Sequence, residues 1–65
     1  MEPNKIAKLR DIMNNGYAKV EGKTVDSFSA SAIIKVYDAL NDENKLRYAS
    51  LTVYQMANMA FKLLK

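Results

Sequence analysis

Apolar residues recur along most of this chain at the spacing of an α-helix. Four such stretches predict helices over residues 4–14, 29–40, 43–49 and 53–64. In the first, Ile6, Leu9 and Met13 fall every three or four positions, with charged residues between them. In the second, an arc of about 160° on a helical wheel holds Ala30, Ile33, Ile34, Val36, Tyr37 and Leu40, whereas Ala32 falls on the polar side. The pattern therefore predicts an all-α fold, a small bundle of three main helices plus one short helix.

The segment 17–25 breaks the helical period. Val20 and Val25 are residue types typical of strands, and Glu21-Gly22 between them suits a two-residue turn. A hairpin this small is only marginally stable in water by itself and has to pack against the helices. An irregular, ordered loop fits the segment almost equally well, so the sequence leaves both alternatives open.

Residues that cap helices stand near the predicted helix ends. Thr52 and Gln55 have the T-x-x-Q spacing of a capping box before the last helix. Gly16 suits the left-handed residue that closes the first helix. Phe28 is expected just before the second helix, packed back onto its first turn. Candidate N-terminal caps are Asn4, Asp26, Ser27, Ser29, Asn41 and Asp42.

The last predicted helix is apolar over roughly 200° of its circumference, more than one neighbouring helix can cover. Either it is the central helix, enclosed by the others, or part of it forms an interface; the central position is favoured. The predicted core comprises Ile6, Leu9, Met13, Ile33, Val36, Tyr37, Leu40, Leu46, Leu51, Met56, Ala60, Phe61 and Leu64.

The chain has 65 residues, which fits one small domain over residues 1–65. A domain of this size buries only about 60% of its unfolded surface, so its core needs efficient packing or a supplement. The sequence contains no cysteine and no histidine, which excludes disulfides and leaves a zinc site without a plausible ligand set. Tight helix packing or self-association remains as the means of stabilising the small core. We expect no metal and no cofactor.

No window approaches the roughly 18 apolar residues of a membrane span. The N-terminal sequence MEPNKIAKLRD also lacks the apolar core of a signal peptide. We therefore expect a cytoplasmic protein with no membrane partner.

The net charge of +3 is unevenly distributed. Residues 26–44 are acidic, whereas residues 45–65 carry four basic side chains and no acid. Basic ends around an acidic middle can steer acidic partners, although an ordinary solvated surface is the simpler explanation.

The pattern V-D-x-x-S-A-S-x-I-x-x-V-Y-D-A-L-N, followed by N-K, a leucine, M-A and A-F-K-L-L, resembles short uncharacterised proteins encoded by tailed bacteriophages. The matching positions are Val25, Asp26, Ser29, Ala30, Ser31, Ile33, Val36 to Asn41, Asn44, Leu51, Met56, Ala57 and Ala60 to Leu64. They cover roughly the last forty residues and consist of core and cap positions, while the first 24 residues lie outside the resemblance. The resemblance implies a phage or prophage origin and a location in the host cytoplasm, with no catalytic residue to transfer.

An enzyme is the least favoured class of function. There is no histidine to transfer protons near neutral pH, and paired carboxylates at helical spacing are missing. The serines near residue 29 are better explained as caps than as nucleophiles. We therefore expect a protein that is not an enzyme.

Two classes of binding function remain. Residues 43–64 have the outline of a helix-turn-helix, with side chains that can contact bases or phosphates, but few of them are basic. The favoured class is a protein-interaction module that docks on a host or phage protein, perhaps as a homo-oligomer, because of the wide apolar arc and four adaptable methionines. A third alternative is an oligomer that binds a small host nucleotide. The candidate interaction surface comprises Lys45, Arg47, Tyr54, Gln55, Asn58, Met59 and Lys62.

Overall fold

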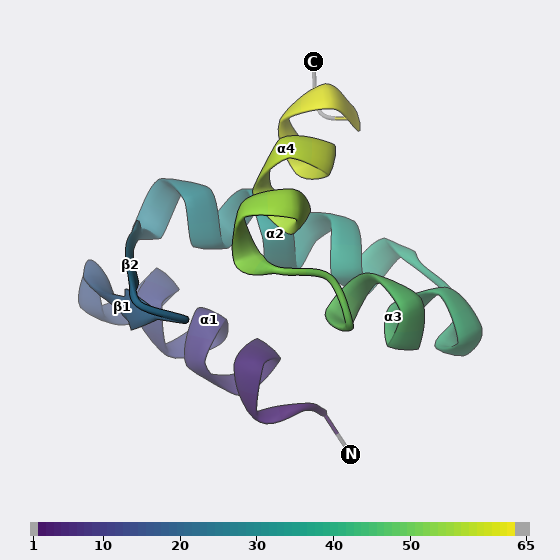
Figure 1. Cartoon of the computed structure of the whole chain (residues 1–65), viewed down its shortest axis with the longest axis horizontal. Helices are drawn as coiled ribbons and strands as arrows, with labels where there is room; N and C mark the ends of the chain where they lie inside the picture. The colour runs from purple at the N-terminus through teal and green to yellow at the C-terminus, as the bar shows by residue number, and fades with distance from the viewer. Residues whose placement is uncertain (1, 64–65) are drawn as a thin grey trace.

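Four helices and one β-hairpin make up the computed structural model, which describes residues 2–63 (Figure 1). In chain order the elements are α1 (Asn4–Asn15), β1 (Tyr17–Val20), β2 (Lys23–Asp26), α2 (Ser27–Ala39), α3 (Asp42–Ala49) and α4 (Val53–Leu63). About 71% of the described residues are helical, which confirms the mainly α-helical prediction. The helix boundaries agree with the predicted ones to within two residues, except that the predicted end at residue 64 lies outside the described residues.

The segment after α1 is a hairpin and not the irregular loop that the sequence also allowed. Strands β1 and β2 pair antiparallel, with Val20 opposite Lys23 across the turn. Glu21 and Gly22 have φ angles of 54° and 77°, the left-handed backbone that a two-residue hairpin turn needs. Val20 and Val25 are buried against the helices, and this burial provides the support that an isolated hairpin lacks.

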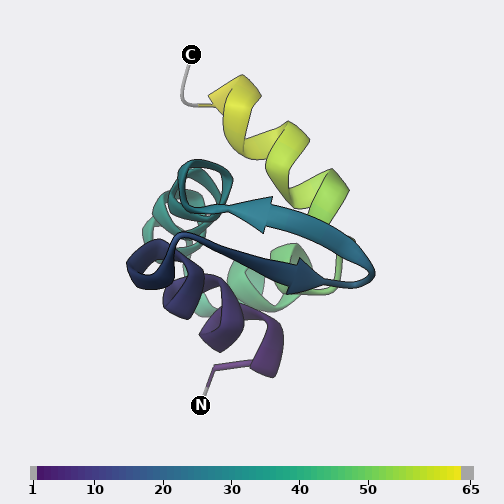
Figure 2. The same ribbon diagram turned by 90° about the vertical axis from the view of Figure 1, so that its left-hand side faces the viewer.

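Helix α2, not α4, is the central element, so the favoured position of the last helix is wrong. α2 contacts α1, α3, α4 and β2, whereas α4 packs mainly on α2 and projects from one side of the molecule (Figures 1 and 2). Two sides of α2 are consequently buried. Ala32, assigned by the pattern to the polar side, is buried on the same side as Val36. A side chain as small as that of Ala32 lets another element approach α2 closely.

The buried residues confirm seven of the predicted core positions: Ile6, Leu9, Ile33, Val36, Tyr37, Met56 and Ala60. Leu40 and Leu51 pack at the edge of the core. Met13, Leu46 and Phe61 are exposed, so their assignment to the core is wrong, and Leu64 lies outside the described residues. Core residues that the prediction missed are Ile12, Val20, Val25, Ala30, Ala32, Ile34, Tyr48 and Val53.

Two of the six candidate N-terminal caps form, together with the capping box and the glycine that closes α1. The Asp26 side chain accepts a hydrogen bond from the Ser29 N–H at 2.8 Å, and Asn41 caps α3 in the same way. The capping box is confirmed, since Thr52 and Gln55 exchange two bonds of 3.1 Å. Gly16 closes α1 with a φ of 102°.

The other predictions about helix starts are wrong. Ser27 and Ser29 lie within α2 and Asp42 within α3, because Asp26 and Asn41 occupy the cap positions. Asn4 is the first residue of α1 and makes no capping bond, because Pro3 occupies the cap position. Phe28 lies within α2 and stacks on Phe61 of α4 instead of on its own helix, with ring centroids 5.8 Å apart.

A polar junction fixes where α4 begins. The Glu21 carboxylate accepts a hydrogen bond from the Val53 N–H at 2.8 Å and lies 2.7 Å from the Lys5 ammonium group. Lys5 also donates to the Leu51 carbonyl at 2.5 Å, so α1, the hairpin turn and the segment before α4 meet at one point. The hydrogen bond from Lys5 holds the pKa of Glu21 below its usual value, with a further contribution from Val53. A charged Glu21 therefore supports the N-terminal end of α4.

Candidate interaction surface

Helices α3 and α4 and the turn between them have the predicted outline of a helix-turn-helix. However, the structure does not bring the seven candidate residues onto one surface. They separate into residues that make contacts within the fold, residues that line a groove between α2, α3 and α4, and residues on the other sides of α4.

Two candidates are occupied within the fold. The Lys45 ammonium group lies 5.3 Å from the centre of the Tyr37 ring, and the side chain is half-buried. Gln55 forms the capping box with Thr52. Neither side chain is fully available to an external partner. The capping role of Gln55 was predicted, whereas the contact of Lys45 with Tyr37 was not.

Arg47 and Met59 come together at an apolar groove between α2, α3 and α4. The groove has a volume of about 350 Å³. Its lining residues are Val36, Leu40, Asn44, Arg47, Tyr48, Leu51, Met59 and Leu63. Six of the eight are apolar or aromatic, so the groove suits an apolar side chain more than a charged ligand.

Met59 and Leu63 form the α4 wall of this groove and remain 43% and 64% exposed. They are four residues apart and therefore lie on the same side of the helix. Across the groove, Arg47 pairs with Glu43 at 3.1 Å on the exposed side of α3. The groove thus has apolar walls with Arg47 in its lining, and Glu43 lies beside Arg47 on α3; we call this charged pair the rim.

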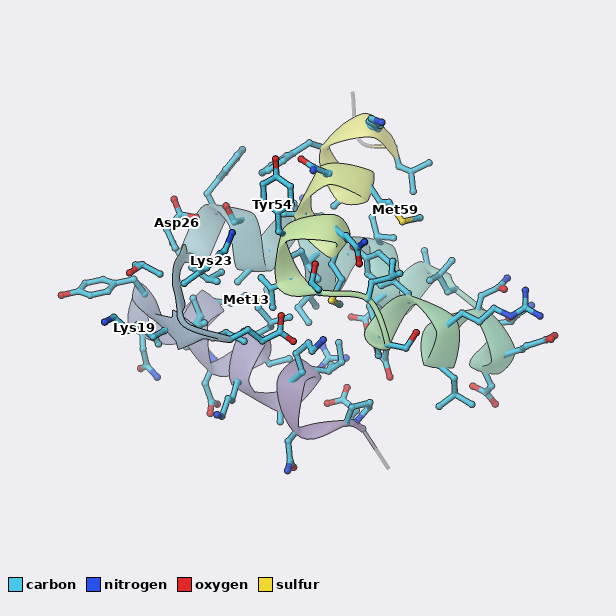
Figure 3. All side chains as sticks on the ribbon, viewed as in Figure 1. Met13, Lys19, Lys23, Asp26, Tyr54 and Met59 are labelled. Carbon is cyan, nitrogen blue, oxygen red and sulfur yellow. The ribbon has the colours of Figure 1, made fainter. Side chains whose placement is uncertain are left out.

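The opposite side of α4 carries aromatic residues. Figure 3 shows Tyr54 and Met59 on opposite sides of this helix, with Lys23 of β2 near Tyr54. The Lys23 ammonium group is 4.9 Å from the centre of the Tyr54 ring, and the stacked pair of Phe28 and Phe61 also joins α2 to α4. These contacts attach α4 to the hairpin and to the start of α2.

The remaining two candidates, Asn58 and Lys62, are exposed on α4. On a helical wheel they lie between the aromatic side and the groove side. They make up a polar stripe, which is consistent with a solvated face and leaves the groove as the apolar part of the candidate surface.

Tyr48 connects the floor of the groove to α4. Its hydroxyl donates a hydrogen bond of 2.7 Å to the Met56 carbonyl, and its side chain is buried. Burial raises the pKa of Tyr48 to about 12. The neutral phenol is therefore part of the folded state.

Replacing Tyr48 with phenylalanine should lower the free energy of unfolding at pH 7 by about 1 kcal/mol, because one buried hydrogen bond is lost. The folded protein holds the Tyr48 proton more tightly than the unfolded chain, whose tyrosines have a pKa of about 10. Stability from this group is complete below pH 10 and is lost as the pH rises through about 12. Urea unfolding followed by circular dichroism should therefore show the gap between the two proteins narrowing above pH 10. Tyr54→Phe, at an exposed site, is the matched control, and a constant gap would contradict the assignment.

The groove residues that the prediction missed are mainly Asn44, Tyr48 and Leu63, together with core positions of α2. Leu63 had a usable pattern, because it follows Met59 and Met56 on the apolar arc of the last helix. Tyr48 had none, since a helix of eight residues repeats too few times to define its buried side. The position of α3 beside α4 depends on tertiary packing, so the groove itself was not predictable.

Comparisons of the chain with protein-family models, curated proteins and solved structures find no match. The resemblance to phage-encoded proteins therefore stays a prediction. Within residues 2–63, no helix is long and apolar enough to cross a membrane. In the same part of the chain, no three acidic side chains gather as a set of metal ligands.

Proposed function

We propose that this chain is a small protein-interaction module without enzymatic activity, of the phage-encoded type that its sequence resembles. Its binding surface is the groove between α2, α3 and α4, and its ligand is an amphipathic helix of a protein. The observation that carries the proposal is the partly uncovered apolar arc of α4, where Met59 and Leu63 stand beside an apolar recess. Helices with apolar residues at i, i+3 and i+4 dock in grooves of this kind.

An amphipathic helix suits this groove because its apolar side matches the apolar walls and its polar edges match the charged rim. Apolar side chains of the partner bury Met59 and Leu63, which gains the free energy of removing apolar area from water. Polar residues along the edges of the partner can pair with Arg47 or Glu43 at the rim. The methionine adapts its shape to the partner at little cost.

The two alternative ligands have weaker support. In the helix-turn-helix alternative, Arg47 is paired with Glu43 and Lys45 covers Tyr37, which leaves few free cations for phosphates. For a nucleotide, the pocket beside Lys45 also contains the acids Glu2 and Asp42, and these would repel phosphate. The apolar groove therefore suits a protein helix better than the surface of α3 and α4 suits a nucleic acid. It also suits a helix better than the pocket beside Lys45 suits a nucleotide.

The proposal is tested by capturing partners from nuclease-treated lysate with three tagged proteins: the parent, Met59→Lys and Asn58→Lys. The two variants add the same charge at adjacent positions, but only residue 59 lines the groove. We expect a nuclease-resistant protein that binds the parent and the Asn58→Lys variant and is lost with Met59→Lys. A partner that all three proteins retain equally, or recovery of nucleic acid alone, would count against the groove as the binding surface.

A further inference from the structure

The structure offers one specific occupant for the groove. We infer that a second copy of this chain fills it, with the two copies related by a two-fold axis and each α4 lying against the groove of the other. This inference rests on the proposed function, because it names the helix that binds. The same residues then act both as the ligand and as the site.

A two-fold interface requires one patch to carry both a projection and a recess, since each copy presents the same surface. Met59 and Leu63 supply the projection: they stand on one side of α4 and are 43% and 64% exposed. The apolar groove of about 350 Å³ beside them supplies the recess. α4 itself is an amphipathic helix, whose polar stripe of Asn58 and Lys62 borders the groove residues on the wheel.

The charges at the rim are also self-complementary. Arg47 and Glu43 form an exposed pair on the same side of α3. Across a two-fold axis, Arg47 of one copy can face Glu43 of the other, so neither charge is left without a partner. A foreign helix with a single sign of charge at this position would leave one of the two unmatched.

The small size of the core gives a reason for association. Among the described residues, the largest side chains with almost no exposed surface are Ile6, Leu9, Ile12, Ile33 and Met56. Small domains without disulfides or metals often complete their cores by oligomerisation, and this chain has no cysteine or histidine. A typical stable interface covers about 800 Å² on each partner, roughly a sixth of the 4539 Å² surface of this chain. Most of one face of the molecule therefore has to take part.

The test is sedimentation equilibrium of the parent chain, Met59→Lys and the control Asn58→Lys over a wide range of concentrations. The parent and the control should form dimers. Met59→Lys should raise the dissociation constant at least ~30-fold, as expected for a central interface residue. If Met59→Lys alters the circular dichroism spectrum, Leu63→Lys at the more exposed position replaces it.

A charge-swap experiment tests the two-fold pairing itself. Glu43→Arg and Arg47→Glu should each weaken dimers by roughly fivefold, because each places like charges at the rim. An equimolar mixture of the two variants should restore association, since one copy then carries only positive and the other only negative rim charges. Failure of the mixture to restore association would contradict the two-fold arrangement.

A parent chain that stays monomeric at all concentrations would overturn the inference, and so would a dimer that Met59→Lys leaves intact. Neither result removes the proposed function by itself. A monomer that still captures a protein through Met59 keeps the module and loses only the second copy as its ligand. A dimer that needs Met59 but captures nothing else supports the inference and limits the ligand to the chain itself.

Discussion

Replacing Ile33 with alanine is expected to leave much of the protein unfolded at 25 °C. Ile33 is completely buried on the central helix α2. Truncating a fully buried isoleucine costs about 2–5 kcal/mol, because apolar contacts are lost and a cavity remains. Small domains have about 5 kcal/mol of stability in total, so the loss is a large part of it. Urea unfolding of the variant, followed by circular dichroism at 222 nm, should show a midpoint near zero denaturant.

Phe61→Ala is the matched control, because the side chain is larger but 39% exposed. Its main contact is the stacked ring of Phe28, so its loss should cost about 1 kcal/mol. The sequence pattern placed Phe61 in the core, where its truncation would cost about 3–5 kcal/mol. If Phe61→Ala proves as damaging as Ile33→Ala, the exposed position of α4 at the edge of the molecule is wrong.

The parts of the fold that were predictable depend on residues close together in the sequence. The capping box of Thr52 and Gln55 marks the start of α4 because both bonds lie within one helical turn. Glu21 and Gly22 mark the hairpin turn for a similar local reason, although the left-handed φ of Glu21 is unusual for a residue other than glycine. Helix type and position followed from a 3.6-residue period that needs no tertiary information.

The errors concern which side of each helix meets the others. On α1 the neighbours Ile12 and Met13 both fit the apolar stripe, and the structure buries only Ile12. On α3, Leu46 is 70% exposed while Tyr48 is buried, because the Tyr48 hydroxyl reaches a carbonyl on α4. Hydrophobicity alone favours the leucine. These choices are set by contacts between elements far apart in the sequence, and a single chain does not reveal them.

Because the sequence does not reveal contacts between distant elements, the predicted candidate surface is scattered over the structure. Sequence analysis selected residues of suitable type in α3 and α4, and three of the seven, Lys45, Tyr54 and Gln55, make contacts within the fold. Met59 and Arg47 were selected for different reasons, the first as an apolar residue and the second as a cation, yet both line one groove. The wide apolar arc correctly indicated that α4 has more apolar surface than one neighbour covers. It did not indicate which part of the arc stays exposed.

Reversing the charges of Arg47 and Lys62 together should separate the protein-binding and nucleic-acid alternatives. A DNA-binding surface loses about one log unit of affinity per decade of salt for each phosphate contact, and Arg47→Glu with Lys62→Glu would abolish binding. A protein-binding groove loses only part of its association rate with the same changes, because rim charges steer encounter more than they hold the complex. Met59→Ala, which removes apolar contacts at the groove wall, should then cause the larger loss of affinity.

We expect the second result, because the basic residues of α3 and α4 form a thin surface for phosphates. Arg47 is already paired with Glu43, and Lys45 lies over an aromatic ring, so Lys62 is the cation of these helices with no ion pair or ring contact among the described residues. Helicity measured by circular dichroism should be unchanged in the double variant, since both side chains are exposed. The direct measurement is retention of the purified parent on a generic DNA column at about 0.15 M salt, near physiological ionic strength. Strong retention that the double reversal removes would make α3 and α4 a nucleic-acid-binding unit, whereas passage through the column leaves the apolar groove as the binding surface.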